Sequence, residues 1–229
     1  MGARDRTLLA KPGARHARTL AFVIALLGLG SPVWSSAPTP TDQLRHTVDR
    51  VLATLNDARP RAPGQAAARE VALRRAVQAR FDFPETAREA LGLYWRDRTP
   101  AERQQFTALF TELLQRSYLA SIARYGGARV EYTGQSLDGS YATVRTRVVT
   151  RSGRPVAVDY QMSLHGDRWL VYDVIVDHVS LVDNYRTQFR DIIATSSYQN
   201  LVDRIEARLR ELRAAAASSA PETRPVQGG

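Results

Sequence analysis

The residue types that most often carry catalysis are few and widely spaced in this 229-residue chain. It has no cysteine, which excludes thiol nucleophiles, thiolate zinc sites, iron–sulfur clusters and disulfides. The histidines after the N-terminal segment are His46, His165 and His178, and no two of them have the spacing of metal ligands. We therefore interpret them as imidazoles at the surface or at strand ends.

Two short segments contain hydrolase-type residues, but neither has the required context. Residues 134–139 read Gly-Gln-Ser-Leu-Asp-Gly, which is one residue longer than a nucleophile elbow and lies at a predicted hairpin. Asp177, His178 and Ser180 lie within four positions, but clustering in sequence does not supply the geometry of Ser–His–Asp catalysis. An exported enzyme that uses Asp173, Asp177 and His178 remains an alternative, and it requires these side chains to converge in a cleft. The chain has no phosphate-binding loop and no dinucleotide fingerprint.

The first 37 residues have the organisation of a secretory signal peptide. Five basic residues and one acidic residue in positions 1–19 precede the apolar run 20–30, and small residues follow up to Ala37. The apolar run is too short for a membrane span, because eleven helical residues extend about 16 Å. We predict cleavage after Ser35 or Ala37 and export of the mature chain. Removing residues 1–37 lowers the formal net charge from +9 to about +5.

The remaining positive charge does not indicate a nucleic-acid partner. Arginines alternate with acidic residues along the predicted helices, as in residues 204–213, which is the pattern of a solvated helix face. No stretch after the leader approaches 18 consecutive apolar residues, so no second membrane span is predicted. A monomer is the expected state, because no surplus apolar stripe is found.

Hydrophobic periodicity predicts helices at both ends of the mature chain and strands between them. Helical patterns cover residues 41–55, 65–80, 84–91, 99–125, 180–195 and 201–212. Four alternating runs joined by short loops predict antiparallel strands near residues 130–132, 142–148, 156–164 and 168–176. This order predicts an α+β fold in one domain, residues 38–213, with helices packed on one face of a four-stranded twisted antiparallel sheet. Residues 214–229 are predicted to be a disordered tail.

The predicted elements carry wide apolar faces. The helix that begins at Thr99 has an aromatic stripe, and the third strand has an unbroken apolar row from Val156 to Leu164. A filled core satisfies this pattern, and so does a core that encloses an apolar pocket between sheet and helices.

Three groups of residues, taken together, are specific enough to indicate a protein family. The first contains Phe81-Asp82-Phe83 and Ala90-Leu91-Gly92-Leu93-Tyr94-Trp95; the second runs from the capping box at Thr99-Pro100-Ala101-Glu102 to Tyr118; the third runs from Trp169 to Phe189. Their order and spacing over about residues 40–210 resemble the MlaC family of periplasmic phospholipid-binding proteins, which includes toluene-tolerance auxiliary components of ABC transport. The chain departs from the family at His178, where glycine is usual, and at Ser196-Ser197, which replaces a glycine-rich break.

The resemblance implies a non-enzymatic periplasmic carrier with no cofactor and a bound glycerophospholipid as cargo. It implies exchange between an outer-membrane lipoprotein–porin complex and the lipid-binding ring of an inner-membrane ABC transporter, in support of outer-membrane lipid asymmetry. Acyl chains would lie between sheet and helices. The residues that periodicity places on the apolar faces then become the lipid-pocket candidates: Phe106, Phe110, Leu113, Tyr118, Val144, Val148, Val156, Val158, Tyr160, Met162 and Leu164. A non-lipid assembly factor with a solid core is the remaining alternative.

Overall fold

The computed structural model describes residues 38–57, 65–122, 125–150 and 153–218. The predicted signal peptide and the last part of the predicted tail, residues 219–229, lie outside the described residues. Within the described ranges, no helix combines the length and the hydropathy that a membrane crossing requires.

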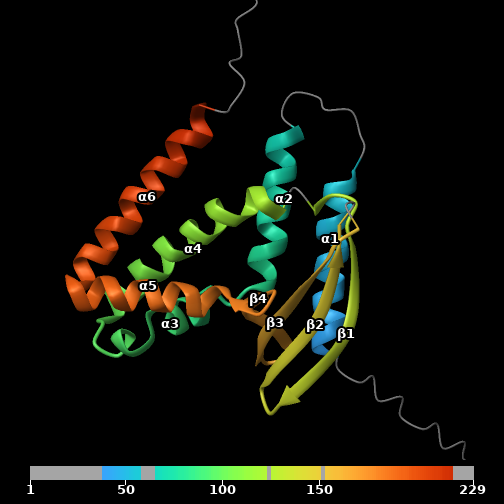
Figure 1. The fold of residues 1–229 in the computed structure, drawn as a ribbon, viewed down its shortest axis with the longest axis horizontal. Helices are drawn as coiled ribbons and strands as arrows, with labels where there is room; N and C mark the ends of the chain where they lie inside the picture. The colour runs from blue at the N-terminus through green and yellow to red at the C-terminus, as the bar shows by residue number, and fades with distance from the viewer. Residues whose placement is uncertain (1–37, 58–64, 123–124, 151–152, 219–229) are drawn as a thin grey trace, which may run out of the picture. The chain divides into compact units, whose positions relative to one another are not determined.

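Helices precede and follow an antiparallel sheet (Figure 1). The elements before the sheet are α1 (Pro40–Asn56), α2 (Gln65–Arg80), α3 (Phe83–Leu91), the 3-10 helix η1 (Gly92–Trp95) and α4 (Pro100–Ile122). The strands are β1 (Arg129–Asp138), β2 (Tyr141–Val149), β3 (Pro155–His165), β4 (Arg168–Val176) and β5 (Val179–Ser180). The chain ends with α5 (Leu181–Thr195) and α6 (Tyr198–Ser218). The α+β class and the order of the elements are as predicted.

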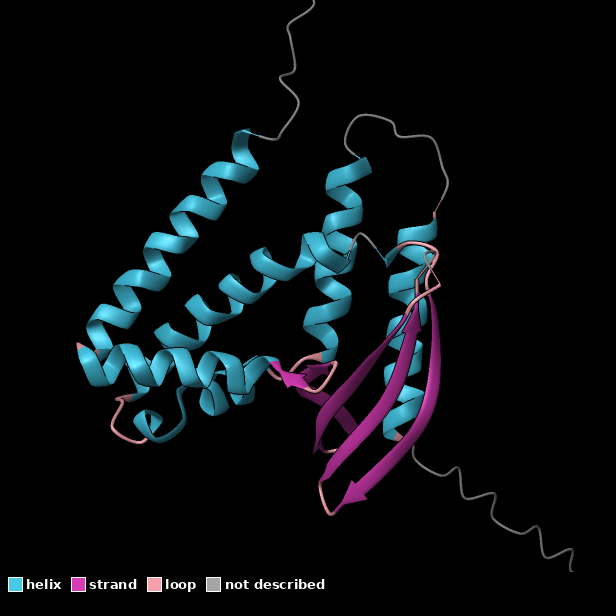
Figure 2. Ribbon diagram, viewed as in Figure 1, coloured by secondary structure: helices cyan, strands magenta, loops and turns pink. Residues whose placement is uncertain are grey.

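The sheet is a meander in the order β1-β2-β3-β4-β5, with every neighbouring pair antiparallel (Figure 2). The predicted count of four strands was therefore wrong by one. Val179 pairs with Val176 and Ser180 pairs with Ile175, which adds β5 at the edge. A strand of two residues has no alternation to detect, so only its pairing with β4 identifies it.

The turn between β4 and β5 holds two residues in the left-handed region of backbone space. Asp177 has φ 46° and His178 has φ 70°. A residue with a Cβ atom pays about 1–2 kcal/mol for this conformation, whereas glycine adopts it freely. His178 thus stands at a position where the backbone conformation favours glycine, the residue that is usual there in the family it resembles.

Local signals in the sequence set the helix ends. The Glu102 amide donates to the Thr99 hydroxyl at 3.2 Å, and the Glu102 carboxylate accepts from the Thr99 amide at 2.7 Å, so the predicted capping box is present. Asp82 caps α3 by accepting from the Glu85 amide at 3.0 Å. Gly92 follows the end of α3 with φ 58°, as predicted for a glycine that ends a helix.

The last helix is longer than predicted. α6 continues to Ser218, so the assignment of residues 214–218 to a disordered tail was wrong. Residues 214–217 are four alanines, and alanine has the highest intrinsic helix propensity. A helix already started at Tyr198 can extend through them without any tertiary contact.

Arg80, at the end of α2, connects three elements on the helical side of the sheet. Its guanidinium donates to the backbone carbonyl of Trp169 on β4 at 2.6 Å and to the Gln43 side chain on α1 at 2.9 Å. Its Nε donates to the hydroxyl of Thr47 at 3.0 Å. These hydrogen bonds fix where α1 and α2 stand against the sheet, and so they position one wall of the candidate site.

Buried apolar residues form two separate clusters. The helical cluster lies among α3, α4, α5 and α6, and includes Ala90, Phe106, Phe110, Phe189 and Leu201. The sheet cluster lies between α1 and the strands, and consists of Leu44, Ala142, Val144, Met162, Trp169 and Val171. The fold therefore has two cores, and the candidate site is the region between them.

Glu112 on α4 is clamped by two guanidinium groups. Arg116 of the same helix approaches it to 2.6 Å and Arg213 of α6 to 2.5 Å. The hydrogen bond with Arg213 is the main cause that lowers the pKa of Glu112 from 4.5 to about 2. Because the folded pKa is depressed, the carboxylate stabilises the fold fully above about pH 4.5, and this contribution is lost as the pH falls towards 2.

We therefore expect Glu112→Gln to lower the melting temperature by a constant amount near neutral pH. This difference from wild type should shrink below about pH 4.5 and vanish near pH 2. Glu211→Gln is the matched control, because Glu211 forms a solvent-exposed pair with Arg208 and should have little effect at any pH. A Glu112→Gln difference that is the same at pH 3 and pH 7 would contradict the assignment.

Candidate functional site

The strand register aligns inward-facing residues from four strands into rows. Tyr132 on β1 is opposite Thr146 on β2, Thr146 is opposite Val158 on β3, and Val158 is opposite Val176 on β4. The adjacent row contains Tyr160 of β3. The inner face of the sheet is thus an apolar wall with a few hydroxyl groups in its centre.

Three of the pocket candidates lie inside the helical cluster. Phe106 and Phe110 are 0% and 1% exposed, and Leu113 is also buried. The ring of Phe110 lies 5.0 Å from that of Tyr185 and 5.3 Å from that of Phe189. These three residues pack against α5 and α6 as an ordinary core does.

Three further candidates belong to the sheet cluster or to its rim. Val144 and Met162 are fully buried under α1. Leu164, two residues beyond Met162, is 37% exposed near the end of β3. These side chains share the inner face of the sheet, but the first two contact protein on all sides.

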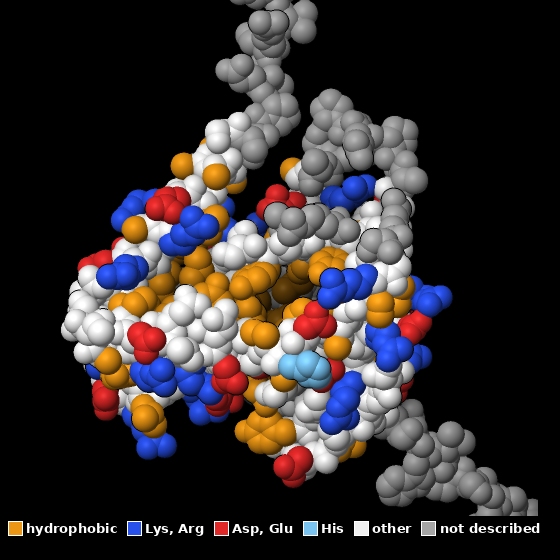
Figure 3. Space-filling model, in the orientation of Figure 1, with side chains coloured by type: hydrophobic (Ala, Val, Ile, Leu, Met, Phe, Trp, Pro, Cys, Tyr) orange, Lys and Arg blue, Asp and Glu red, His pale blue; other side chains and the backbone are white. Residues whose placement is uncertain are grey.

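The remaining candidates are members of neither cluster, although Tyr160 packs against the sheet cluster. Val158 and Tyr160 are only half-buried although they lie mid-strand on the sheet's inner face. Val156, near the start of β3, is also half-buried, whereas Val148 opposite it on β2 is buried. Tyr118 on α4 is 39% exposed. Figure 3 shows the surface hollowed at this level, with hydrophobic side chains on the walls between α2, α4 and the sheet. A core packed to normal density would bury the middle of a sheet face completely.

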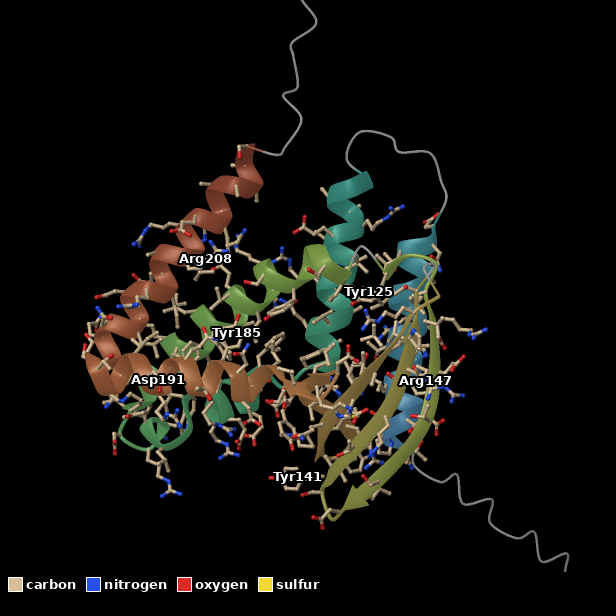
Figure 4. All side chains as sticks on the ribbon, in the orientation of Figure 1. Tyr125, Tyr141, Arg147, Tyr185, Asp191 and Arg208 are labelled. Carbon is tan, nitrogen blue, oxygen red and sulfur yellow. The ribbon has the colours of Figure 1, made fainter. Side chains whose placement is uncertain are left out.

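Several tyrosines that pack against the two clusters have raised pKa values. Burial raises the pKa of Tyr160 to about 12, Tyr125 acts in the same direction, and a hydrogen bond with Thr146 opposes the shift. Burial also raises the pKa of Tyr185, and its interaction with Tyr118 adds to that effect. Figure 4 shows Tyr185 between α5 and α4, and Tyr125 beside the sheet. These phenols keep their protons at neutral pH, so they act as neutral hydrogen-bonding groups.

Two buried polar atoms belong to residues that were not among the sequence-predicted site residues. The Tyr132 hydroxyl and the Gln115 Nε2 are buried and find no hydrogen-bond partner among the described residues. The other amide atom of Gln115 accepts from Arg74 at 3.2 Å, which joins α4 to α2. No sequence signal could have found them, because an unpaired polar atom is defined by what surrounds it in space.

A second hollow, with a volume of about 350 Å³, lies against the opposite face of the sheet. Its walls come from α3, α5 and the outer side of the strands, and include Glu89, Gln161, Tyr172 and Arg186. Arg186 is paired with Glu89 at 2.9 Å and with Asp183 at 2.6 Å. The lining has four carboxyl groups, those of Glu85, Glu89, Asp173 and Asp183, and the single guanidinium of Arg186, so its polar walls do not suit an apolar ligand.

The structure does not bring together the residues of the alternative enzymatic hypothesis. Asp173 is buried and accepts from the Ser180 hydroxyl at 2.6 Å and from the amides of Val182 at 3.0 Å and Val174 at 2.8 Å. Burial raises its pKa, which these hydrogen bonds oppose. Asp177 and His178 are exposed in the β4–β5 turn. Asp173 therefore anchors the start of α5.

A different Ser, His and Asp do meet in space, a contact that sequence reasoning missed. The Nε2 of His165 lies 2.9 Å from the Asp82 carboxylate and 3.1 Å from the Ser163 hydroxyl. A catalytic triad needs Asp and Ser on different ring nitrogens, so that the imidazole can take the serine proton while Asp orients it. Both contacts use the same nitrogen here, and Asp82 also caps α3. The trio ties β3 to the start of that helix.

One protein family matches most of the chain. The MlaC protein family matches residues 45–207. A toluene tolerance protein, ttg2D of Pseudomonas putida, is 27% identical over 68% of this chain and 74% of its own length. The intermembrane phospholipid transport system binding protein MlaC of Haemophilus influenzae is 19% identical over 52% of this chain and 58% of its own length.

A solved structure has the same architecture. It is a phospholipid-binding protein from Ralstonia solanacearum in complex with a phospholipid, with a TM-score of 0.66 and 29% sequence identity over 75% of this chain and 97% of that one. The family match covers most of the described residues, including both walls of the hollow. The chain therefore belongs to the MlaC family.

Proposed function

We propose that the protein is a periplasmic carrier of glycerophospholipid, and that the acyl chains occupy the hollow between the two clusters. The observation that carries this proposal is the half-buried state of Val158 in the middle of the sheet's inner face. Protein interiors are close-packed, so an apolar side chain that stays partly exposed at this position has room for a bound apolar ligand to pack against it. The complex of the Ralstonia solanacearum relative with a phospholipid supports a lipid as that partner.

The proposed lipid contacts divide by location. Val156, Val158, Tyr160 and Tyr118 would contact acyl chains directly, because they remain partly accessible between the clusters. Seven other candidates are proposed to support this wall from behind or at its edges: Phe106, Phe110, Leu113, Val144, Val148, Met162 and Leu164.

The energetics of such a carrier require an assisted handoff. Two acyl chains contain about 30 methylenes, and burial of each is worth about 0.8 kcal/mol relative to water. The gross value of about 24 kcal/mol exceeds the ceiling of non-covalent affinity, so spontaneous release into water is very slow. A membrane already holds the chains in hydrocarbon, so exchange between membrane and carrier can be nearly neutral. This supports exchange at membrane complexes, with an outer-membrane lipoprotein–porin complex and an inner-membrane ABC transporter as the proposed partners.

Native mass spectrometry tests the proposal directly. The full chain is expressed with its leader, purified from a bacterial periplasm and measured without detergent. The expected result is a mass increase that corresponds to bound phospholipid, which solvent extraction removes and identifies. Ligand-free protein throughout, with no extractable lipid, would overturn the proposal and favour a solid assembly factor.

A further inference from the structure

The inner face of the sheet carries a polar spot among apolar side chains, beside the sheet cluster. Tyr132 stands in the cross-sheet row next to Thr146, and Tyr160 occupies the adjacent row. Thr146 is 3% exposed and donates its proton to the backbone carbonyl of Val158 at 2.7 Å. Electrostatic interactions couple Tyr132 to Tyr160, and Tyr160 to Tyr125 beyond the end of α4. Three tyrosines from distant parts of the chain thus border one region.

The Tyr132 hydroxyl is the unpaired member of this group. Its oxygen is buried and no described group lies within hydrogen-bond distance of it. Arg45 of α1 packs on the Tyr132 ring, with its guanidinium carbon 4.6 Å from the ring centroid, and this contact holds the ring in place. A buried hydroxyl without a partner is costly, so the geometry calls for an acceptor supplied from outside the protein.

The chemistry of that acceptor is restricted. Burial raises the pKa of Tyr132, so the hydroxyl stays protonated and donates. Asp49 raises the pKa of Tyr132 and Arg45 lowers it by a smaller amount, so no excess of positive charge favours a phosphate anion at this buried position. In a glycerophospholipid, the uncharged oxygen acceptors closest to the acyl chains are the ester carbonyls.

Resting on the proposed function, we propose that the Tyr132 hydroxyl donates a hydrogen bond to an ester carbonyl of the bound glycerolipid. This subsite would set how deeply the acyl chains enter the hollow. It would also make the protein distinguish ester-linked from ether-linked lipids, because a dialkyl ether lacks the carbonyl oxygen.

A competition experiment tests this subsite. Delipidated full-length protein is incubated with vesicles that contain equal amounts of a diacyl phosphatidylglycerol and its dialkyl ether counterpart with matched chains. The protein is re-isolated, and the bound lipids are extracted and quantified by mass spectrometry. Wild type is expected to hold about three- to tenfold more ester than ether, the value of one net hydrogen bond between neutral groups. Tyr132→Phe keeps the ring and is expected to bring the ratio close to one.

Tyr141→Phe is the matched control. Tyr141 is an exposed tyrosine at the opposite end of the sheet from Tyr125, so its variant should keep the wild-type ratio (Figure 4). Equal binding of ester and ether lipid by wild type, or an unchanged preference in Tyr132→Phe, overturns the subsite while lipid binding itself stands. Equal loss of both lipids in Tyr132→Phe also overturns it, because the hydroxyl would then serve the phosphate or the packing. Binding of neither lipid by wild type refutes the proposed function and this inference with it.

Discussion

Val158→Trp is expected to eliminate the co-purifying phospholipid while the protein stays folded. Val158 lies mid-strand on β3, half-buried, between Thr146 and Val176 in the cross-sheet row. If lipid occupies the space in front of it, an indole placed there fills volume that acyl chains would take. The measurement combines solvent extraction of lipid with thermal melting. Delipidated wild type is the reference for melting, because bound ligand raises apparent stability.

Ala157→Trp is the matched control for size and strand position. Ala157 precedes Val158, points to the other face of β3 and is exposed, so a tryptophan there should leave the lipid in place. In a filled core, Val158→Trp would overpack and destabilise by about 1–3 kcal/mol. A Val158→Trp protein that melts far below delipidated wild type and still carries lipid would disprove a lipid site on this face.

Phe110→Ala is expected to destabilise the protein by about 3–5 kcal/mol, the usual cost of removing a buried phenylalanine. Phe110 is 1% exposed and lies in an aromatic cluster with Phe106, Tyr185 and Phe189. Its removal leaves a cavity that α5 and α6 close only in part. The change in free energy of unfolding is measured by urea titration of delipidated protein, in which lipid makes no contribution.

Leu93→Ala is the control for Phe110→Ala, because Leu93 is 79% exposed and its truncation should change stability by less than about 0.5 kcal/mol. If Phe110 instead faced the lipid, its truncation would alter lipid content and leave the delipidated protein nearly as stable as wild type. The variants Val158→Trp and Phe110→Ala thus test separately whether Val158 lines a binding site and whether Phe110 belongs to the core behind it.

Much of the fold is encoded in local patterns. The capping box between Thr99 and Glu102 marks the start of α4, and Gly92 marks the end of α3, because both signals act within one helical turn. The alternation of β2 and β3 predicts their inward faces, because successive side chains in a strand point to opposite sides. β5 has no such local signal, since it exists only through its pairing with β4.

By itself, the sequence determined the elements, their order, their apolar faces and the resemblance to the MlaC family. Only the tertiary structure decided which apolar residues have protein opposite them. Phe110 and Val158 carry the same signal, an apolar residue in phase with its element, yet one is buried by α5 and the other is left half-exposed. Periodicity specifies the side on which a residue lies, whereas burial depends on elements far away in the chain. The unpaired hydroxyl of Tyr132 is a property of the same kind, because it arises from the packing of β1 against α1 and β2.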